Sequence, residues 1–399
     1  MIRSGNRSRL GSRVEYDGAT YEAADLDPTI YQAIGLPGRP EKYGSLRLLF
    51  NEIRGLFKLH LEMPTADAGL STAFAICSWL VDASQNALAL GLSCSDEQRG
   101  IDTLRLLGCF CRRPLLLADL TSTGLRSLPM HLMPTLLVDQ QSMGMPLQRL
   151  LCASNHRGLH VTGNGGQLLD VFGAKAIFSC DEGGLDALGL NVIRIFLGQQ
   201  SSDNPLSLND SARNQIADRF QPRLLMFRLK NLVQPRKCCV DLSKFTSATR
   251  PLARTIAECF VEDPRLATDA VQLLEAQDQE VRASRCLDPS CAALEILLGL
   301  IHQGESQEIQ VDELTRDLNT LLRSRGELLE YRPEEIGWRL RAMKVPRHTD
   351  SSGRKIVLGR ETSLRVHRLA RGYDLLIGPL VGHQCSDCQL ESFDSTVVM

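Results

Sequence analysis

The stretch from Leu88 to Gln140 constrains the fold of this chain more than any other part of it. It begins with an apolar run, continues through a polar turn and a helical pattern, and later reaches a second apolar run that ends in Asp139. Short apolar runs bounded by turn residues predict buried strands, and a helical pattern between two such runs predicts a strand–helix–strand unit. The sequence therefore predicts an α/β domain with flanking helices on a largely parallel sheet.

Similar apolar runs recur through residues 84–200 and predict strands at about 87–92, 115–118, 135–139, 174–179 and 191–196. Two helices are expected ahead of the sheet. The first covers residues 46–63, with an apolar face formed by Leu46, Leu49, Phe50, Ile53, Leu56 and Phe57. The second begins near Thr65 or Asp67, runs to Val81 and places Trp79 in its apolar face.

The turn after the first strand can be compared with a phosphate-binding loop, Gly-x-x-x-x-Gly-Lys-Ser/Thr. In such a loop backbone N–H groups surround the phosphates, the Lys contacts the outer phosphates, and the hydroxyl holds Mg²⁺. Here the second glycine survives, Ile replaces the Lys and Asp replaces the hydroxyl. The corresponding residues are Ser95, Gly100, Ile101, Asp102 and Thr103.

Two further acids, Asp96 and Glu97, lie in this turn. Two like charges at about 4 Å repel by about 4 kcal/mol at an effective dielectric constant near 20, so the turn is poorly suited to a polyanion. The strand at residues 134–138 is followed by Asp139 and then by Gln140. A glutamate after that aspartate normally activates water, and an amide cannot act as a general base near neutral pH. Neither ordinary ATP binding nor hydrolysis is expected.

Residues 46–200 resemble the P-loop ATPase domain of helicase- or primase-associated proteins of phages, plasmids and other mobile elements. The motifs that carry this resemblance are Leu49-Phe50-Asn51-Glu52-Ile53-Arg54, Trp79, the altered loop, Pro134 to Gln140, Asn155-His156-Arg157-Gly158, Phe172-Gly173-Ala174-Lys175-Ala176 and Leu190 to Ile195. The resemblance implies an AAA+/helicase-like P-loop NTPase fold. It also implies a third lost catalytic position, because Asn191 replaces the Arg of an Asp-Arg pair that can act on a neighbouring subunit's nucleotide. No cofactor is expected.

The C-terminal segment, 288–375, predicts a winged helix. Helical patterns at 291–302, 312–325, 333–344 and 361–373 alternate with a short strand at 308–311 and a hairpin at 345–358. In a winged helix the third helix lies in the DNA major groove and the hairpin lies beside it. Trp338 lies between Ile336 and Leu340, and we expect it in the core of this domain.

Local charge favours DNA as the partner of this segment. Between Arg332 and Tyr373 there are eleven basic residues and four acidic ones, an excess of seven positive charges, although the whole chain has a net charge of −2. Such an excess would neutralise phosphates. The expected contacts are Arg339, Arg341, Arg347, Arg354 and Lys355. A protein-interaction role remains the alternative, because winged helices also bind proteins and Arg-rich faces are often simply solvated.

The tail contains one Cys-x-x-Cys pair, Cys385 and Cys388, which is half of the ligand set of a zinc site. His383 would be a third ligand, whereas Cys286 and Cys291 lie in another element. The sequence alone therefore assigns no metal. The chain has thirteen cysteines in all, and most of the others have apolar neighbours, which indicates core thiols in a reducing cytoplasm. The N-terminus lacks the apolar region of a signal peptide, and no apolar run approaches the ~18 residues of a membrane span.

These patterns divide the chain into an N-terminal arm (1–45), a degenerate ATPase-like domain (46–205), a helical connector (206–287), a winged helix (288–375) and a flexible tail (376–399). The leading hypothesis is a catalytically inactive DNA-binding or scaffolding subunit of a mobile-element replication or defence system, with a protein partner or oligomerisation left open. One alternative is a slow or partner-completed ATPase in which Arg99 contacts the phosphates. Another is an adaptor that binds protein and no DNA.

Overall fold

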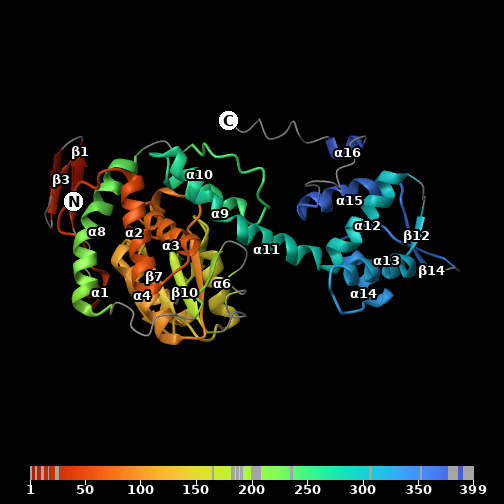
Figure 1. Cartoon of the computed structure of the whole chain (residues 1–399), viewed down its shortest axis with the longest axis horizontal. Helices are drawn as coiled ribbons and strands as arrows, with labels where there is room; N and C mark the ends of the chain where they lie inside the picture. The colour runs from red at the N-terminus through yellow and green to blue at the C-terminus, as the bar shows by residue number, and fades with distance from the viewer. Residues whose placement is uncertain are drawn as a thin grey trace. The chain divides into compact units, whose positions relative to one another are not determined.

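The computed structural model describes residues 2–4, 7–9, 13–16, 18–22, 27–163, 166–180, 185, 188, 192–198, 208–233, 237–304, 308–350, 353–375 and 385–389. The chain divides into two compact units (Figure 1). The first comprises Met1–Lys244 and Ala248–Gln277, and the second comprises Phe245–Ser247 and Asp278–Met399. Helix α11 (Glu275–Cys286) contains the boundary between them.

A five-stranded parallel sheet forms the centre of the first unit. Its strands are β5 (Ala89–Ser93), β6 (Pro114–Ala118), β7 (Thr135–Asp139), β10 (Lys175–Ser179) and β11 (Val192–Phe196), in the order β11-β5-β10-β7-β6. The expected parallel sheet and its five strands are confirmed. Because β10 pairs with both β5 and β7, the carboxyl ends of these three strands meet at one edge of the sheet.

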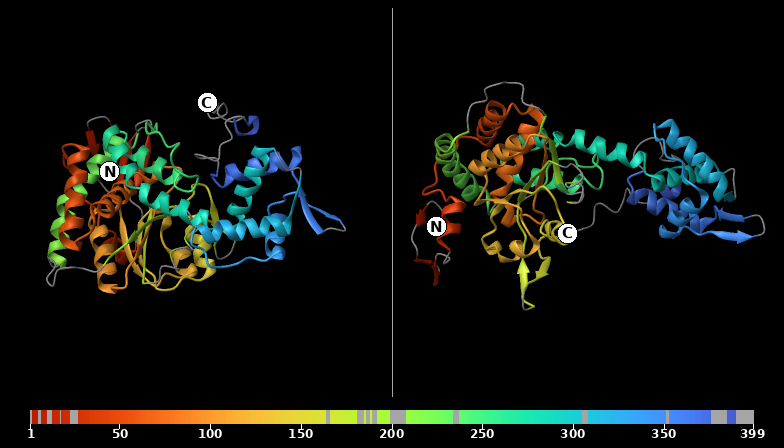
Figure 2. Two further views of the ribbon diagram at one scale, coloured as in Figure 1. Left: turned by 45° about the vertical axis from the view of Figure 1, so that its right-hand side comes forward. Right: turned by 90° about the horizontal axis from the view of Figure 1, so that it is seen from below.

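Helices cover both faces of this sheet (Figure 2). On one face α4 (Glu97–Phe110) packs against β6, β7 and β10. On the other, Leu136, Val138 and Ile177 pack in one core with apolar side chains of α5 (Ser122–Ser127) and α6 (Met145–Ala153). Burial on both faces explains why these strands are continuous apolar runs without polar alternation.

The two helices expected ahead of the sheet are present as α2 (Leu46–Leu61) and α3 (Thr65–Ser78). The apolar face of α2 is buried, and Trp79 at the end of α3 is 3% exposed. The indole Nε1–H of Trp79 donates to the backbone oxygen of Phe110 at 2.7 Å. A buried indole usually has such a partner, because an unsatisfied donor would weaken the core.

Later helices also pack in the first unit. They are α8 (Asp210–Asn231), which packs against α4, and α9 (Arg250–Cys259) and α10 (Pro264–Gln272), which pack against α3. Arg223 of α8 binds the Glu52 carboxylate of α2 through two nitrogens, at 2.7 and 3.0 Å. This bidentate pair fixes the two helices relative to each other.

Residues 1–45 form more regular structure than the arm expected from the sequence. They contain two short hairpins, β1 (Ile2–Ser4) with β2 (Arg7–Arg9) and β3 (Arg13–Tyr16) with β4 (Ala19–Glu22), followed by helix α1 (Pro28–Ile34). A third hairpin, β8 (His160–Thr162) with β9 (Leu168–Asp170), follows α6. Single turns of 3₁₀ helix lie at Val81–Ala83 and Met130–Leu132.

The second unit has the element order expected for residues 288–375. Helix α12 (Pro289–Gln303) is followed by β12 (Glu308–Gln310), α13 (Val311–Ser324), α14 (Pro333–Ala342), β13 (His348–Asp350), β14 (Gly353–Val357) and α15 (Arg360–Gly372). The strands form an antiparallel sheet in the order β12-β14-β13. A short helix, α16 (Ser386–Gln389), follows in the tail.

Trp338 corrects one expectation for this unit, because its side chain is 68% exposed. Helix α14 buries Ile336 and Leu340, which lie four residues apart on one face. Trp338 is two residues from each and therefore projects from the opposite face. Within the part of the chain that the structure describes, no helix combines the length and apolar character needed to cross a membrane.

Candidate functional sites

The junction between β5 and α4 is where a phosphate loop would lie, and it is very short. Only three residues, Cys94 to Asp96, separate the strand from the helix. Ser95 is exposed in this turn, and the Asp96 carboxylate accepts from the Arg99 amide at 3.2 Å as the helix N-cap. Ile101 consequently lies a full turn past the start of α4, and no extended loop is present to surround a phosphate.

The other residues that were compared with a phosphate loop serve the packing of α4. A Cβ added to Gly100 would lie 2.2 Å from the ring of Phe178, so the glycine allows α4 to approach β10. The Thr103 side chain is buried, and its hydroxyl donates to the Arg99 carbonyl at 2.8 Å. Asp102 forms an ion pair with Arg105 at 3.1 Å. The Thr103 hydroxyl and the Asp102 carboxylate are therefore already engaged within α4 and are not available to a nucleotide.

Arg99 is the residue on which the partner-completed ATPase depends. Its side chain is buried, and its Nη2 donates to the backbone oxygen of Leu61 at 2.7 Å, at the end of α2. Within the described residues, its Nε and Nη1 have no hydrogen-bond partner. This guanidinium is held by the packing of α2 on α4, which argues against a role at the phosphates.

Gln140 connects the loops that follow β6 and β7. Its buried side chain accepts from the Leu120 amide at 2.7 Å and donates to the Ser142 carbonyl at 2.6 Å. A glutamate at this position could not donate the second bond. Asp139 accepts from Gln141 Nε2 at 2.8 Å. Asn191, which the resemblance to P-loop ATPases compares with a catalytic arginine, lies outside the described residues.

The carboxyl edge of the sheet has negative charge near the candidate nucleotide site. Partial desolvation raises the pKa of the Cys180 thiol, and the carboxylates of Glu97 and Asp139 raise it further. The same field that disfavours a thiolate would disfavour a phosphate group. Glu97 and Asp139 thus place negative charge at this edge, and the expected loss of phosphate-binding chemistry stays a prediction.

Three of the five arginine and lysine residues nominated for DNA contact gather between α14 and the β13–β14 hairpin. Arg347 Nη1 donates to the Gly337 carbonyl at 2.6 Å. A Cβ on Gly337 would lie 3.5 Å from Arg347 Nη1 and 3.7 Å from Arg354 Nη1. Desolvation lowers the pKa of Arg347, and the positive charges of Arg341 and Arg354 lower it further. We call these three residues the arginine cluster.

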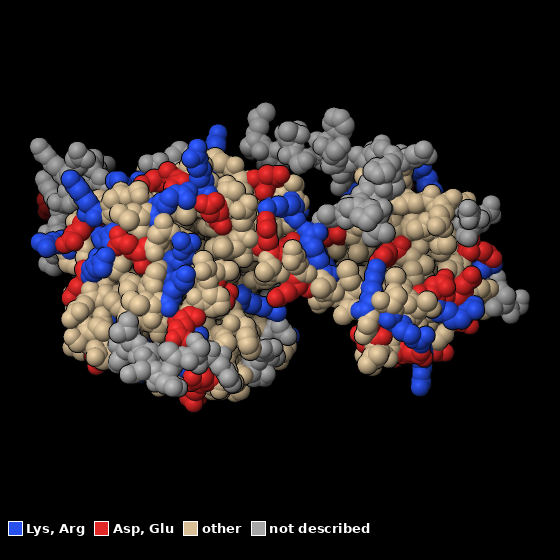
Figure 3. Space-filling model, in the orientation of Figure 1, with Lys and Arg blue, Asp and Glu red and all other residues tan. Residues whose placement is uncertain are grey.

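Arg339 and Lys355 are engaged elsewhere. Arg339 lies over the ring of Tyr331, with 5.7 Å from its Cζ to the ring centroid, and its Nη1 is 3.4 Å from Ser290 Oγ. Lys355 pairs with Glu308 across the β12–β14 ladder at 3.0 Å. Among the described residues, no carboxylate forms an ion pair with the arginine cluster. Figure 3 shows basic and acidic side chains interspersed over the described surface of one face.

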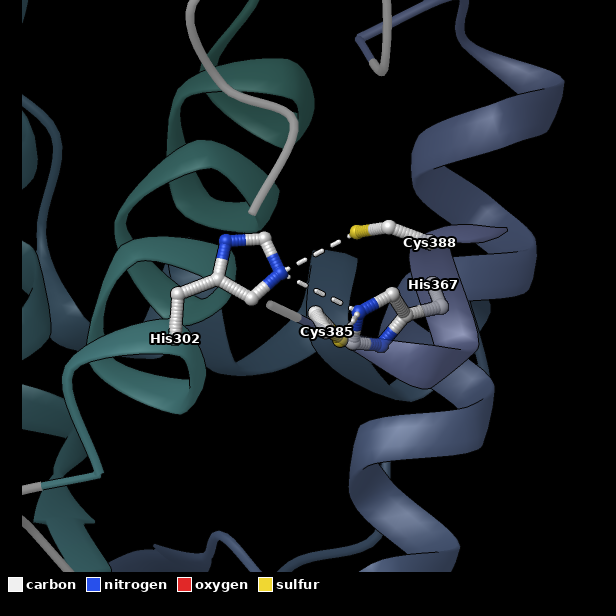
Figure 4. A group of neighbouring side chains, drawn as sticks. All are labelled: His302, His367, Cys385 and Cys388. Atoms are coloured by element: carbon white, nitrogen blue, oxygen red, sulfur yellow. Dashed lines mark hydrogen bonds between the residues drawn. The ribbon is translucent and has the colours of Figure 1, made fainter. Parts of the chain in front are cut away.

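A second group in this unit has the composition of a metal site. His302 of α12, His367 of α15, and Cys385 and Cys388 at α16 point toward one another (Figure 4). One ligand atom from each of the four lies within 4.8 Å of the others. The sequence had suggested the two cysteines with His383 as a third ligand, and His383 lies outside the described residues.

The two histidines have well-defined surroundings. His367 is 1% exposed, and its Nδ1 is 2.8 Å from the Ser363 carbonyl one turn earlier in α15. Burial lowers the pKa of His302, and its neighbour His367 lowers it further. Local sequence gave no signal for these residues, because 65 residues separate the two histidines and only the fold of the unit brings them together.

Comparisons with known proteins assign no family. No protein-family model and no curated protein matches the sequence. Two solved structures, both apo A forms of the NrS-1 C-terminal region, align with 88% of this chain and 83% of their own, at 12% identity and TM-scores of 0.39 and 0.40. A similarity of this degree assigns neither an activity nor a partner to the chain.

Proposed function

We propose that the second unit is a winged-helix domain that binds DNA and that the first unit is a phosphate-loop-like scaffold without nucleotide hydrolysis. The observation that carries the proposal is the arginine cluster, Arg341, Arg347 and Arg354. Arg347 and Arg354 both lie beside Gly337, the positive charges of Arg341 and Arg354 act on Arg347, and no described carboxylate pairs with the three. A phosphate backbone would relieve this repulsion.

The position of the cluster supports DNA as the ligand. It joins the third helix of the unit, α14, to the following hairpin, β13–β14. In a winged helix these two elements lie in and beside the major groove, where phosphates of the backbone are within reach. Arg341 and Arg354 are exposed, and Arg347 is half-buried. We assign phosphate contact to these residues and give Arg339 and Lys355 structural roles.

The first unit supports a scaffolding role. It has a strand–turn–helix arrangement and, in the same sheet, a strand that ends in an aspartate. However, the turn has only three residues, and the helix starts with two acidic residues, the N-cap Asp96 and then Glu97. The resemblance to helicase- and primase-associated ATPases suggests the setting, a DNA-bound subunit in a mobile-element replication or defence system.

An adaptor function is the second candidate, and one observation favours it. Leu328, Leu329 and Trp338 are 91%, 65% and 68% exposed. Large apolar side chains exposed in this number on one small unit can form the centre of a protein interface. The DNA-binding experiment separates the two candidates.

The test measures the affinity of the full chain for a fluorescent DNA duplex by anisotropy over a series of salt concentrations. We expect binding that weakens with salt, and we expect Arg341→Ala and Arg354→Ala each to reduce the magnitude of the slope of log K against log salt by about one. Arg339→Ala should leave the slope nearly unchanged, because that side chain is engaged by Tyr331 and Ser290.

Arg323→Ala is the matched control, since Arg323 is an exposed arginine of the same unit that pairs with Glu330. An unchanged slope in Arg341→Ala and Arg354→Ala would refute the cluster as the DNA contact. Absence of salt-dependent binding by the unmodified chain would refute DNA binding itself and leave the adaptor as the better proposal.

A further inference from the structure

We propose that His302, His367, Cys385 and Cys388 bind one structural Zn²⁺ ion, which fastens α16 to α12 and α15. Two imidazole nitrogens and two cysteine sulfurs are a common ligand set for structural zinc. The four residues come from three elements of the same unit (Figure 4).

Three of the six distances between the ligand atoms are close to the edges of a zinc tetrahedron, and all four atoms lie within 4.8 Å of one another. With Zn–N bonds of about 2.0–2.1 Å and Zn–S bonds of about 2.3 Å, a tetrahedron places two nitrogens about 3.3 Å apart and a nitrogen and a sulfur about 3.6 Å apart. The observed distances are 3.2 Å between the two Nε2 atoms, 3.3 Å from His367 Nε2 to Cys385 Sγ and 3.3 Å from His302 Nε2 to Cys388 Sγ. The ion would need little rearrangement of these side chains.

The tautomer of His367 also suits a metal ligand. Its Nδ1 lies 2.8 Å from the Ser363 carbonyl, which can only accept a hydrogen bond, so the ring proton lies on Nδ1. In the neutral ring the lone pair is then on Nε2, the atom that faces the two sulfurs and the other imidazole. Metal-binding histidines usually have their second nitrogen fixed in this way by a carbonyl or carboxylate.

The ligand set also indicates which metal binds and what it does. Two thiolates balance the charge of a divalent ion, and their formation releases two protons as the metal enters. Thiolate and imidazole together favour zinc over Mg²⁺ or Ca²⁺, which prefer oxygen ligands. Four protein ligands leave no open coordination position for a substrate, so the site is structural and not catalytic.

The experiment uses the full chain, stripped of metal with a chelator under reducing conditions and then titrated with Zn²⁺ or Co²⁺. We expect one equivalent of zinc per chain by native mass spectrometry. With Co²⁺ we expect the visible absorption of a tetrahedral ion and a thiolate-to-cobalt charge-transfer band. Cys388→Ser and His302→Gln should each weaken zinc binding by at least about 100-fold, since a metal ligand contributes more than a residue that only supports one.

The matched controls are Cys286→Ser and His348→Gln, which change an exposed cysteine and an exposed histidine of the same unit outside the group of four. Both should bind zinc as the unmodified chain does. Failure of the unmodified chain to bind cobalt with a thiolate band would overturn the proposal, whatever the variants do. A disulfide between Cys385 and Cys388 in the zinc-treated chain after removal of the reductant would also contradict it.

Discussion

Lys175 is a buried cation at the first position of β10 and is 1% exposed. Its ammonium donates to the side-chain oxygen of Asn155, which is a neutral partner. Burial lowers the pKa of Lys175 to about 7, and nearby Cys152 opposes this shift. A buried lysine without a carboxylate partner destabilises the folded state whenever its amine is protonated.

Lys175 should make the stability of the protein depend on pH. Between about pH 7 and its ordinary pKa of 10.5, the unfolded chain binds this proton and the folded chain does not. The free energy of unfolding should therefore rise with pH through this window, by up to about 5 kcal/mol for this residue alone. Lys175→Met should flatten that rise in urea unfolding measured from pH 7 to 10.

The surface variant Lys58→Met provides the comparison, because Lys58 is exposed on α2. It should retain the pH dependence of the unmodified protein. Equal slopes for Lys175→Met and Lys58→Met would show that Lys175 carries its proton in the folded state at pH 7 to 10.

Helix α4 contains two glycines at which the neighbouring strands leave different amounts of space. It packs against β10 at Gly100 and against β7 at Gly108. A Cβ at Gly100 would lie 2.2 Å from the Phe178 ring, whereas a Cβ at Gly108 would meet its nearest neighbour, Leu137, at 3.5 Å. The two glycines share one helix and differ in the room beside them.

Gly100→Ala and Gly108→Ala should therefore change stability in opposite directions. Overpacking against Phe178 should destabilise the Gly100→Ala variant by about 1–3 kcal/mol. Gly108→Ala should stabilise the fold by about 0.5–1 kcal/mol, because alanine loses less conformational freedom in a helix and the site has space for a methyl group. Denaturant unfolding of both variants measures the difference, and a stabilised Gly100→Ala variant would contradict the close packing of α4 on β10.

At the scale of the whole molecule, two units carry different parts of the proposed function. The first has a sheet whose carboxyl edge has negative charge and a three-residue turn. The second has its own apolar core and the arginine cluster. The proposed scaffold and the proposed DNA contact thus fall in separate units.

We expect no Mg²⁺-dependent ATP binding by the full chain at micromolar concentrations in calorimetry. We also expect none in the double variant Ile101→Lys and Gln140→Glu, which restores both lost functional groups. Ile101 lies a turn past the start of α4, and the short turn cannot surround phosphates, so a restored cation alone is insufficient. Micromolar binding by the double variant would show that the two replaced groups, and not the short turn, prevent ATP binding. Binding by the unmodified chain would refute the proposed scaffold.

Local pattern determined the elements of this protein. The strands, the helices before the sheet and the order of elements in residues 288–375 follow from apolar periodicity, which residues close in sequence supply. The Cys-x-x-Cys pair was visible for the same reason, and so was the isoleucine that follows Gly100.

Tertiary structure decided which side chains are in contact and which are exposed, because these features depend on residues far apart in sequence. Only the packing of α2 on α4 draws Arg99 to Leu61, and only the burial of Ile336 and Leu340 in the core leaves Trp338 exposed. The same holds for the candidate metal site, where α12 and α15 bring His302 and His367 to the cysteines of α16. The sequence determines which chemical groups are available, and the packing of the elements determines which of them come into contact.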